Sequence, residues 1–198
     1  PVRADIAALP EPVDRMTGHD EAVHILIVGG SLGALALNEI VPQALALLAR
    51  DQALEIRHQA GRNKTEAAQS LYQELNLQAR VTEFLDDMAQ AYAWADLVIC
   101  RAGALTVSEL AAVGVGAILV PYPFAVDDHQ TRNADYLVQG QAAVLMPQDQ
   151  LDAGSLSNKL RELLTEPGKL LAMALAARKL AMPDAAGRVA DYCEQVVR

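Results

Sequence analysis

Residues 96–110 combine side chains and a spacing that could bind a nucleotide. A short apolar run of strand type breaks at Gly103, and a helix carrying Thr106 and Glu109 in its first two turns is expected to follow. The free N–H groups and the positive dipole end of such a helix attract phosphate. Glu109, one turn further along, can accept hydrogen bonds from both hydroxyls of a ribose. The same stretch is equally compatible with a capped helix on a strand, in which Glu109 is a first-turn acid that favours the dipole.

A second candidate for phosphate binding is the glycine-rich stretch at residues 29–33, which follows an apolar run and precedes a helical pattern. Glycine lets the backbone turn sharply and approach a ligand, and Ser31 offers a hydroxyl and an N–H group. The dinucleotide fingerprint is absent, because Val28 stands where its first glycine belongs and His58 and Gln59, rather than an acid, end the second strand. The phosphate loop with lysine is absent as well. A glycine turn that serves packing alone is the alternative.

A third polar stretch, residues 127–133, follows the fifth apolar run. Gln130 and Asn133 carry amides that can donate and accept together, as sugar hydroxyls require. His129 could ligate a metal with the two acids before it, although one histidine beside two acids is common in loops. A solvated polar loop is the alternative.

The elements that must position these stretches alternate between strands and helices. Strands are predicted at residues 24–28, 54–59, 80–85, 97–100, 117–120 and 142–145. Helices are predicted from residue 34, with a kink or division caused by Pro42, and at residues 64–75, 86–94, 104–113, 132–139, 155–164, 167–180 and 185–197. This alternation implies an α/β fold: a six-stranded parallel sheet covered on both faces, doubly wound and Rossmann-like, with helices at the carboxyl end.

The amino-terminal segment indicates how the chain is divided into a linker and a domain. Residues 1–20 contain three prolines and no periodicity, so we expect a linker between domains there and one domain over residues 21–198. The chain opens at Pro1 without an initiator methionine, which suggests a processed or excised piece, half of a larger protein.

The charge and the hydrophobic pattern exclude several classes of protein. A net charge of -9 and the absence of a basic stripe argue against nucleic-acid binding. No apolar run approaches the roughly 20 residues of a membrane span, and nothing resembles a signal peptide. Cys100 ends a predicted buried strand and Cys193 lies far away, so reduced thiols in the cytoplasm are expected.

Several motifs together resemble one family, in order and in spacing. They are Val-Gly-Gly-Ser-Leu-Gly-Ala at residues 28–34, His-Gln before a glycine at 58–59, Val-Thr-Glu-Phe-Leu-Asp-Asp-Met at 81–88, Ala-Tyr-Ala-Trp-Ala-Asp at 91–96, Arg-Ala-Gly-Ala-Leu-Thr-Val-Ser-Glu at 101–109, and His-Gln with Asn-Ala at 129–134. Almost the whole chain resembles the carboxyl-terminal half of the MurG glycosyltransferase family. Members move N-acetylglucosamine from UDP-N-acetylglucosamine to a lipid-linked muramyl pentapeptide in bacterial wall synthesis, which converts lipid I to lipid II.

The resemblance implies the GT-B architecture, in which two Rossmann-like domains enclose the active site and the second domain binds the donor. The residues it implies are Arg3 and Ser31 for the diphosphate, the backbone at Leu85 for the uracil edge, the turn of Ala104, Leu105 and Thr106 for the phosphates and sugar, Glu109 for the ribose diol, and Gln130 for the sugar hydroxyls. It implies no cofactor, no metal and no catalytic residue within this chain.

The resemblance assigns the remaining functions to an amino-terminal domain that this chain lacks. That domain would bind the lipid acceptor, supply the general base, and hold the enzyme on the inner, cytoplasmic face of the membrane. This chain is therefore expected to bind donor without turning it over. A stand-alone UDP-sugar-binding module without catalysis is the alternative, and the missing fingerprint disfavours an NAD-type oxidoreductase domain.

Overall fold

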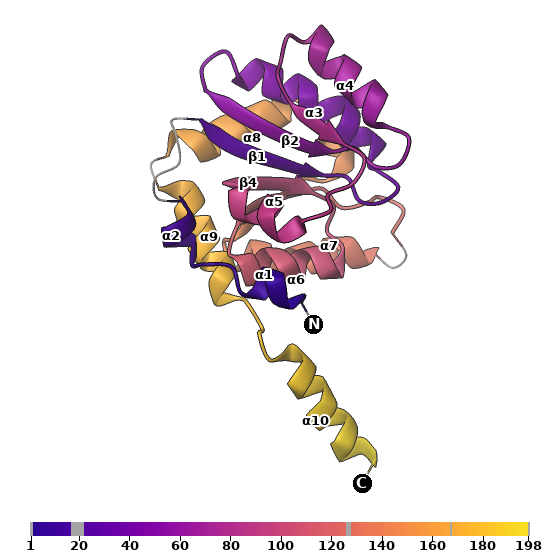
Figure 1. Ribbon diagram of the computed structural model, residues 1–198, viewed down its shortest axis with the longest axis vertical. Helices are drawn as coiled ribbons and strands as arrows, with labels where there is room; N and C mark the ends of the chain where they lie inside the picture. The colour runs from indigo at the N-terminus through magenta and orange to yellow at the C-terminus, as the bar shows by residue number, and fades with distance from the viewer. Residues whose placement is uncertain (1, 17–21, 126–127, 167, 198) are drawn as a thin grey trace.

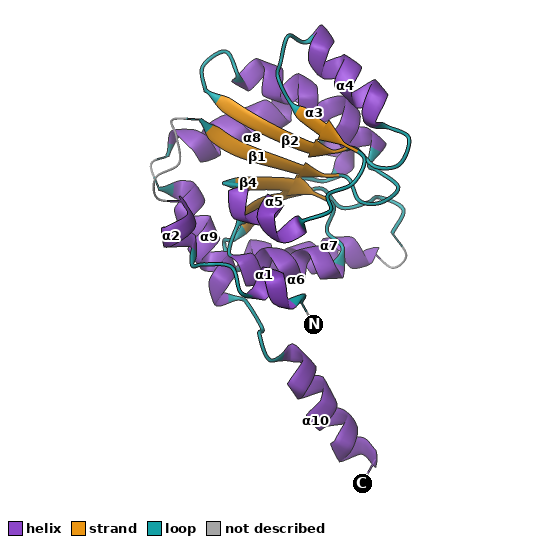
Figure 2. Ribbon diagram, in the orientation of Figure 1, coloured by secondary structure: helices purple, strands orange, loops and turns teal. Residues whose placement is uncertain are grey.

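The computed structural model describes residues 2–16, 22–125, 128–166 and 168–197, and in this part of the chain it contains one six-stranded sheet (Figures 1 and 2). The strand order is β3-β2-β1-β4-β5-β6, and every neighbouring pair is parallel. The strands are β1 (Val23–Val28), β2 (Leu54–Gln59), β3 (Arg80–Thr82), β4 (Leu97–Cys100), β5 (Gly116–Leu119) and β6 (Ala143–Leu145). The predicted α/β, Rossmann-like fold is confirmed.

Helices cover both faces of the sheet and bury two aliphatic clusters (Figure 2). On one face lie α3 (Leu35–Leu48), α4 (Thr65–Glu74) and α8 (Ala153–Thr165). On the other lie α1 (Ala4–Ala7), α5 (Met88–Trp94), α6 (Ala104–Val113) and α7 (His129–Gln139), and α9 (Lys169–Lys179) adds residues to both clusters. The remaining helices are α2 (Pro12–Met16), the short 3-10 helix η2 (Gln148–Gln150) and α10 (Ala185–Val197), which extends away from the sheet (Figure 1).

Most predicted bounds differ from the structure by no more than two residues, and three local predictions differ further. Pro42 does not divide α3, because the residues around it are buried against the sheet and α8, and this packing offsets the one backbone hydrogen bond that proline removes. The third strand ends at Thr82 rather than at Leu85, since the chain must leave the sheet before Asp87 caps α5. Helix α7 begins at His129, three residues earlier than the predicted start at residue 132.

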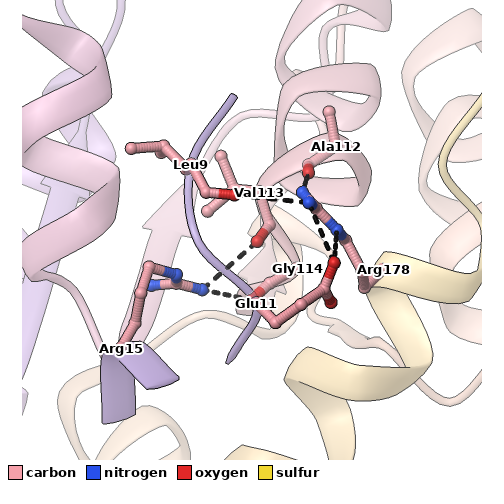
Figure 3. Close-up of polar contacts among 7 residues, drawn as sticks. All are labelled: Leu9, Glu11, Arg15, Ala112, Val113, Gly114 and Arg178. Carbon is pink, nitrogen blue, oxygen red and sulfur yellow. Dashed lines mark hydrogen bonds and ion pairs between the residues drawn. The ribbon is translucent and has the colours of Figure 1, made fainter. Parts of the chain in front are cut away.

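The segment expected to be a linker without regular elements contains α1 and α2, and residues 17–20 lie outside the described part of the chain. Ile6 is completely buried in the cluster beneath α5 and α6. Arg15 is buried as well, and its guanidinium donates to the carbonyl oxygens of Val113 at 3.2 Å and Gly114 at 2.6 Å (Figure 3).

Arg178 of α9 makes a second set of contacts beside Arg15 (Figure 3). It donates to the carbonyl oxygens of Ala112 and Leu9 and forms an ion pair with Glu11 at 3.1 Å. The last carbonyl groups of a helix lack partners within it, and a cation near them is favoured by the helix dipole. The two arginines therefore bind the end of α6 and attach residues 2–16 to the domain.

None of the helices in the described part of the chain is long and apolar enough to cross a membrane.

Candidate functional site

The strand order reverses between β1 and β4, and a crevice opens beyond the carboxyl ends of these two strands. Val28 of β1 is the register partner of both Gln59 of β2 and Cys100 of β4, so the loops after these strands start at the same edge. This reversal point is where open α/β sheets bind their ligands. A cavity of about 710 Å³ lies there, lined by residues 29–36 and by side chains from the loops after β4 and β5.

The glycine-rich stretch forms a tight loop whose shape requires glycine. Gly30 and Gly33 have φ angles of 80° and 68°, in the left-handed region that side chains disfavour. A Cβ on Gly33 would overlap the carbonyl oxygen of Ala60, and one on Gly61 would overlap the backbone of Gly33. The two backbones therefore pack directly together, and Ser31 is left exposed in the lining of the cavity.

Neither helix that starts at this crevice is capped by a side chain. Ala34 precedes α3 and Gly103 precedes α6, and neither provides a side-chain hydrogen bond. By contrast, Asp87 caps α5 and Asp152 caps α8. The first turn of α6 is also open to solvent, since Ala104 and Leu105 are exposed. The start of α3 lines the cavity, and the start of α6 follows the neighbouring strand β4 at the same edge of the sheet. An uncapped helix start with its positive dipole end suits an anion.

Two basic side chains that the sequence analysis did not single out also line this cavity. Lys64 donates to the carbonyl oxygen of Leu32 at 2.6 Å, and Arg101 donates to the carbonyl of Pro121 at 3.0 Å and to Gln148 at 2.6 Å. Burial lowers the pKa of the Arg101 guanidinium, although the group stays charged near neutral pH. These two cations line the crevice together with one acid, Glu39, in a chain whose net charge is -9.

Glu109 is the sixth residue of α6, beyond the first turn, so its interpretation as a first-turn acid that favours the dipole is wrong. Its side chain is 16% exposed, and its two oxygens accept from Arg3 at 3.3 Å and from the Tyr92 hydroxyl at 3.1 Å. Burial, and to a smaller degree Cys100 and the Glu109 carboxylate, raises the pKa of the Tyr92 phenol, which therefore stays protonated as a donor. The carboxylate is held in place one turn beyond the helix start.

Arg3 lies beside Glu109 and does not line the cavity that Ser31 lines. Its side chain is 51% exposed. The structure therefore brings Arg3 together with the residue expected to bind ribose, rather than with the serine expected to share the diphosphate.

Leu85 lies in a separate, smaller cavity of about 250 Å³, beyond the end of β3. Phe84 lines the same cavity and is exposed. No hydrogen bond engages the N–H or C=O of Leu85 within the residues that the structure describes. A backbone with a free donor and a free acceptor can pair with the edge of a pyrimidine base.

Gln130 and Asn133 hold the turn after β4 by side-chain hydrogen bonds. The Gln130 Oε1 atom accepts from the N–H of Tyr122 at 2.9 Å and from the N–H of Ala102 at 3.3 Å. Asn133 Nδ2 donates to the carbonyl oxygen of Ala102 at 3.1 Å. Because two N–H groups occupy its oxygen, Gln130 can offer a ligand its Nε2 donor but not the combined donor and acceptor that the sequence analysis expected.

The metal hypothesis for His129 rests partly on Asp127, which lies outside the described residues. Within the described ranges, no three His, Cys, Asp or Glu side chains lie together in a metal-binding arrangement.

A buried polar network lies behind the glycine loop. His58 is completely buried, and its ring nitrogens contact the Tyr72 hydroxyl at 3.0 Å and Asn38 Oδ1 at 3.1 Å. Asn38 Nδ2 donates to the carbonyl oxygen of Ala60 at 2.9 Å, so the Asn38 oxygen must accept from the imidazole. These bonds place one ring proton on Nε2 and leave Nδ1 to accept from Tyr72. Burial lowers the pKa of His58 to about 4, and the ring is neutral.

The neutral His58 predicts a loss of stability in mild acid. The unfolded chain takes up a proton at this histidine near its ordinary pKa of 6.5, whereas the folded chain does so only near 4. The free energy of unfolding should therefore fall by about 2–3 kcal/mol as the pH is lowered through this window. Urea titrations at a series of pH values measure the fall. A His58→Gln variant should lose most of the slope, and an unchanged slope in that variant would refute the assignment.

The strand order, the crevice at its reversal point and the two uncapped helix starts define a Rossmann-like α/β domain whose crevice suits an anionic ligand. The family model described as "Glycosyltransferase family 28 C-terminal domain" matches residues 24–189, and the chain belongs to this family.

Curated relatives extend the likeness over nearly the whole chain. The UDP-N-acetylglucosamine--N-acetylmuramyl-(pentapeptide) pyrophosphoryl-undecaprenol N-acetylglucosamine transferase of Marinobacter nauticus is 53% identical over 193 residues, which are 98% of this chain and 53% of that protein. The enzyme of the same name from Xanthomonas oryzae pv. oryzae is 55% identical over 195 residues, which are 98% of this chain and 44% of that protein. The chain thus spans about half the length of the curated relatives it matches.

Solved structures agree with this assignment. The crystal structure of Acinetobacter baumannii MurG superposes with a TM-score of 0.88 at 45% identity, and the match covers 96% of this chain and 55% of that one. The resemblance to the MurG family that the sequence motifs indicated is confirmed. The carboxyl-terminal CMP-Kdo-binding domain of WaaA from the same organism has a TM-score of 0.60 at 15% identity over 81% of this chain and 90% of that one, which concerns the fold alone.

Proposed function

We propose that this chain is the donor-binding half of an inverting glycosyltransferase that moves N-acetylglucosamine from UDP-N-acetylglucosamine to a lipid-linked muramyl pentapeptide in peptidoglycan synthesis. The observation that carries the proposal is the crevice between β1 and β4, where the glycine loop and the uncapped start of α6 lie at one edge of the sheet and Glu109 lies one turn further. The names of relatives that are 53–55% identical support the same substrate and reaction.

The proposed roles follow the chemistry of each group. The Ser31 loop and the N–H groups of Ala104, Leu105 and Thr106 would bind the diphosphate, and Glu109 would accept from the ribose diol. The free backbone groups at Leu85 would pair with uracil. Arg3 would reach the diphosphate by leaving its ion pair with Glu109, which its exposure permits.

These groups would assist the transfer by stabilising the leaving group. An acceptor hydroxyl attacks the anomeric carbon as the bond from that carbon to the diphosphate oxygen breaks, and UDP leaves with the electron pair. Helix N–H groups and nearby positive charge stabilise the developing negative charge on the diphosphate. A base must take the proton of the acceptor hydroxyl, and we place that base in the amino-terminal half of the relatives, outside the length that this chain spans.

We propose that the rest of the activity lies in that amino-terminal half, which residues 1–20 would join to the donor domain at residues 21–198. That half would bind the lipid acceptor and hold the enzyme as a peripheral protein on the cytoplasmic face of the membrane. No cofactor and no nucleic-acid partner belong to this proposal.

A covalent fusion tests the proposal. The chain alone should show no transfer from UDP-N-acetylglucosamine to a lipid-linked muramyl pentapeptide, and fusion to the amino-terminal half of the Marinobacter nauticus relative should restore turnover. The assay follows radiolabelled sugar entering the lipid product. Turnover by the chain alone would refute the half-enzyme assignment. A folded fusion that binds donor but never transfers it would favour the stand-alone binding module instead.

We propose that Gln130 recognises the donor sugar by a hydrogen bond from its Nε2 atom. Its amide oxygen is fixed by two backbone N–H groups, so the direction in which Nε2 points is fixed as well. In the fusion, Gln130→Ala should lower turnover of UDP-N-acetylglucosamine about tenfold and narrow its advantage over UDP-N-acetylgalactosamine, whose hydroxyl at carbon four points the other way. Binding of UDP alone measures the separate effect of losing the contacts to Ala102 and Tyr122, so the preference between the two sugars is the deciding result. If the variant keeps the preference for UDP-N-acetylglucosamine, another side chain distinguishes the two sugars.

A further inference from the structure

The His58–Gln59 pair at the end of β2 is part of the sequence motifs but has no role in the proposed function so far. The Gln59 side chain is buried, and the whole residue is 4% exposed. Its Oε1 atom accepts from the N–H of Gly30 at 2.9 Å, and its Nε2 atom donates to the carbonyl oxygen of Gly30 at 3.0 Å and to that of Glu83 at 2.8 Å. Both hydrogens of the amide and its oxygen are therefore engaged.

The partners of Gln59 belong to two different loops. Gly30 lies in the glycine loop, which lines the 710 Å³ cavity proposed to hold the diphosphate. Glu83 starts the loop that carries Leu85, which lines the 250 Å³ cavity proposed to hold uracil. One buried amide thus bridges the loops of both cavities.

The space beside Gly30 is open, whereas the far end of the same loop is closely packed; besides Gln59, the N–H of Gly33 bonds to the Gly30 carbonyl oxygen at 2.8 Å. A Cβ on Gly30 would have no neighbour within 4 Å, although its φ angle of 80° is in the left-handed region. Gly33, in contrast, lies directly against the carbonyl group of Ala60, which the His58 network fixes from behind. Consecutive residues of a strand point to opposite faces. His58 and Gln59 therefore support the two ends of the loop from opposite sides of the sheet.

We propose that Gln59 is a positioning residue that couples the phosphate half of the donor site to the base half. This inference rests on the proposed function. Gln59 holds the Gly30 peptide in the orientation that presents the Ser31 loop, and it ties that loop to the backbone that pairs with uracil. Binding of the base therefore orders the loop that receives the diphosphate, and each half of the donor strengthens binding of the other.

Calorimetry with UDP and with uridine tests the coupling in the 198-residue chain. The ratio of the uridine Kd to the UDP Kd measures what the diphosphate adds to binding. Gln59→Leu should lower this ratio about tenfold, because all three side-chain hydrogen bonds to the loops are lost. Gln59→Met, which is unbranched and has a similar length, should do the same and replaces the leucine variant if that one does not fold.

Gln43→Leu is the matched control. Gln43 is an exposed glutamine of α3 whose Nε2 donates to the carbonyl oxygen of Glu39 in its own helix. This variant should keep the parent ratio within twofold. A role of Gln59 in stability alone would lower both affinities by the same factor and leave the ratio unchanged.

The outcomes separate this inference from the proposed function. If the parent chain binds UDP and the folded Gln59 variants keep the parent ratio of the uridine Kd to the UDP Kd, the coupling is refuted. The assignment of the donor site is then unaffected. If the parent chain binds no UDP, the proposed function fails and the coupling fails with it. Faster hydrogen exchange of the Gly30 amide in the variants, and not in Gln43→Leu, accompanies the expected result.

Discussion

Glu109→Ala should weaken binding of UDP to this chain by about 1–3 kcal/mol, the usual loss when a charged hydrogen-bonding partner is removed. The Tyr92 hydroxyl and Arg3 each bind one oxygen of the carboxylate, which stays 16% exposed and keeps lone pairs for the ribose hydroxyls. Calorimetry measures the loss, and a thermal scan of each variant shows whether it is folded.

Two controls separate ribose binding from a structural role of Glu109. Thymidine diphosphate lacks the 2'-hydroxyl, so its binding should be much less sensitive to the substitution than that of UDP. Ser108→Ala changes the preceding residue of α6, whose hydroxyl bonds to the carbonyl of Ala104, and should leave UDP binding within twofold. Equal losses for the two nucleotides would show that Glu109 acts through the helix.

Arg15→Met should lower the free energy of unfolding by about 3–4 kcal/mol. The methionine keeps the apolar stem of the side chain but removes the guanidinium. The carbonyl groups at the ends of α5 and α6 that accept from the guanidinium then lose this hydrogen-bond donor. Urea unfolding at neutral pH measures the loss from the shift of the midpoint.

The matched control is Arg161→Met. Arg161 forms an exposed ion pair with Asp51 at 3.2 Å, and pairs of this kind contribute little to stability. We expect a change within about 0.5 kcal/mol. A similarly small loss for Arg15→Met would mean that residues 2–16 attach to the domain only loosely.

The sheet could be predicted because buried parallel strands are short apolar runs that stand out in the sequence. The second strand and the last helix have the predicted bounds, residues 54–59 and 185–197. The two short helices at residues 4–7 and 12–16 could not be predicted, because too few turns form to show a period. They are stabilised by distant contacts, from Arg15 to α6 and from Arg178 to Leu9 and Glu11.

The candidate site was predictable where local spacing carries the chemistry. The glycine loop and the helix start at residues 104–106 follow from strand–turn–helix patterns, and Glu109 follows from its distance along the helix. The amide of Gln59 has no such signal, because its role depends on two loops that meet only in the fold. Lys64 and Arg101 look like ordinary surface cations in the sequence. Leu85 was expected only from the family resemblance. Its proposed contact uses backbone atoms, which every residue has, so its side chain gives no signal in the sequence.

Titration of the chain with UDP, in the presence and absence of a chelator, tests the donor-site assignment most directly. Calorimetry should show one weak site per chain with the same Kd in both conditions, because the proposed contacts are helix N–H groups, hydroxyls, Arg3 and Glu109 rather than clustered acids. A purine nucleoside diphosphate should bind more weakly, since the backbone at Leu85 is proposed to read a pyrimidine edge. Absence of UDP binding to the folded chain would contradict the account, and binding that vanishes with the chelator would contradict its metal-free site.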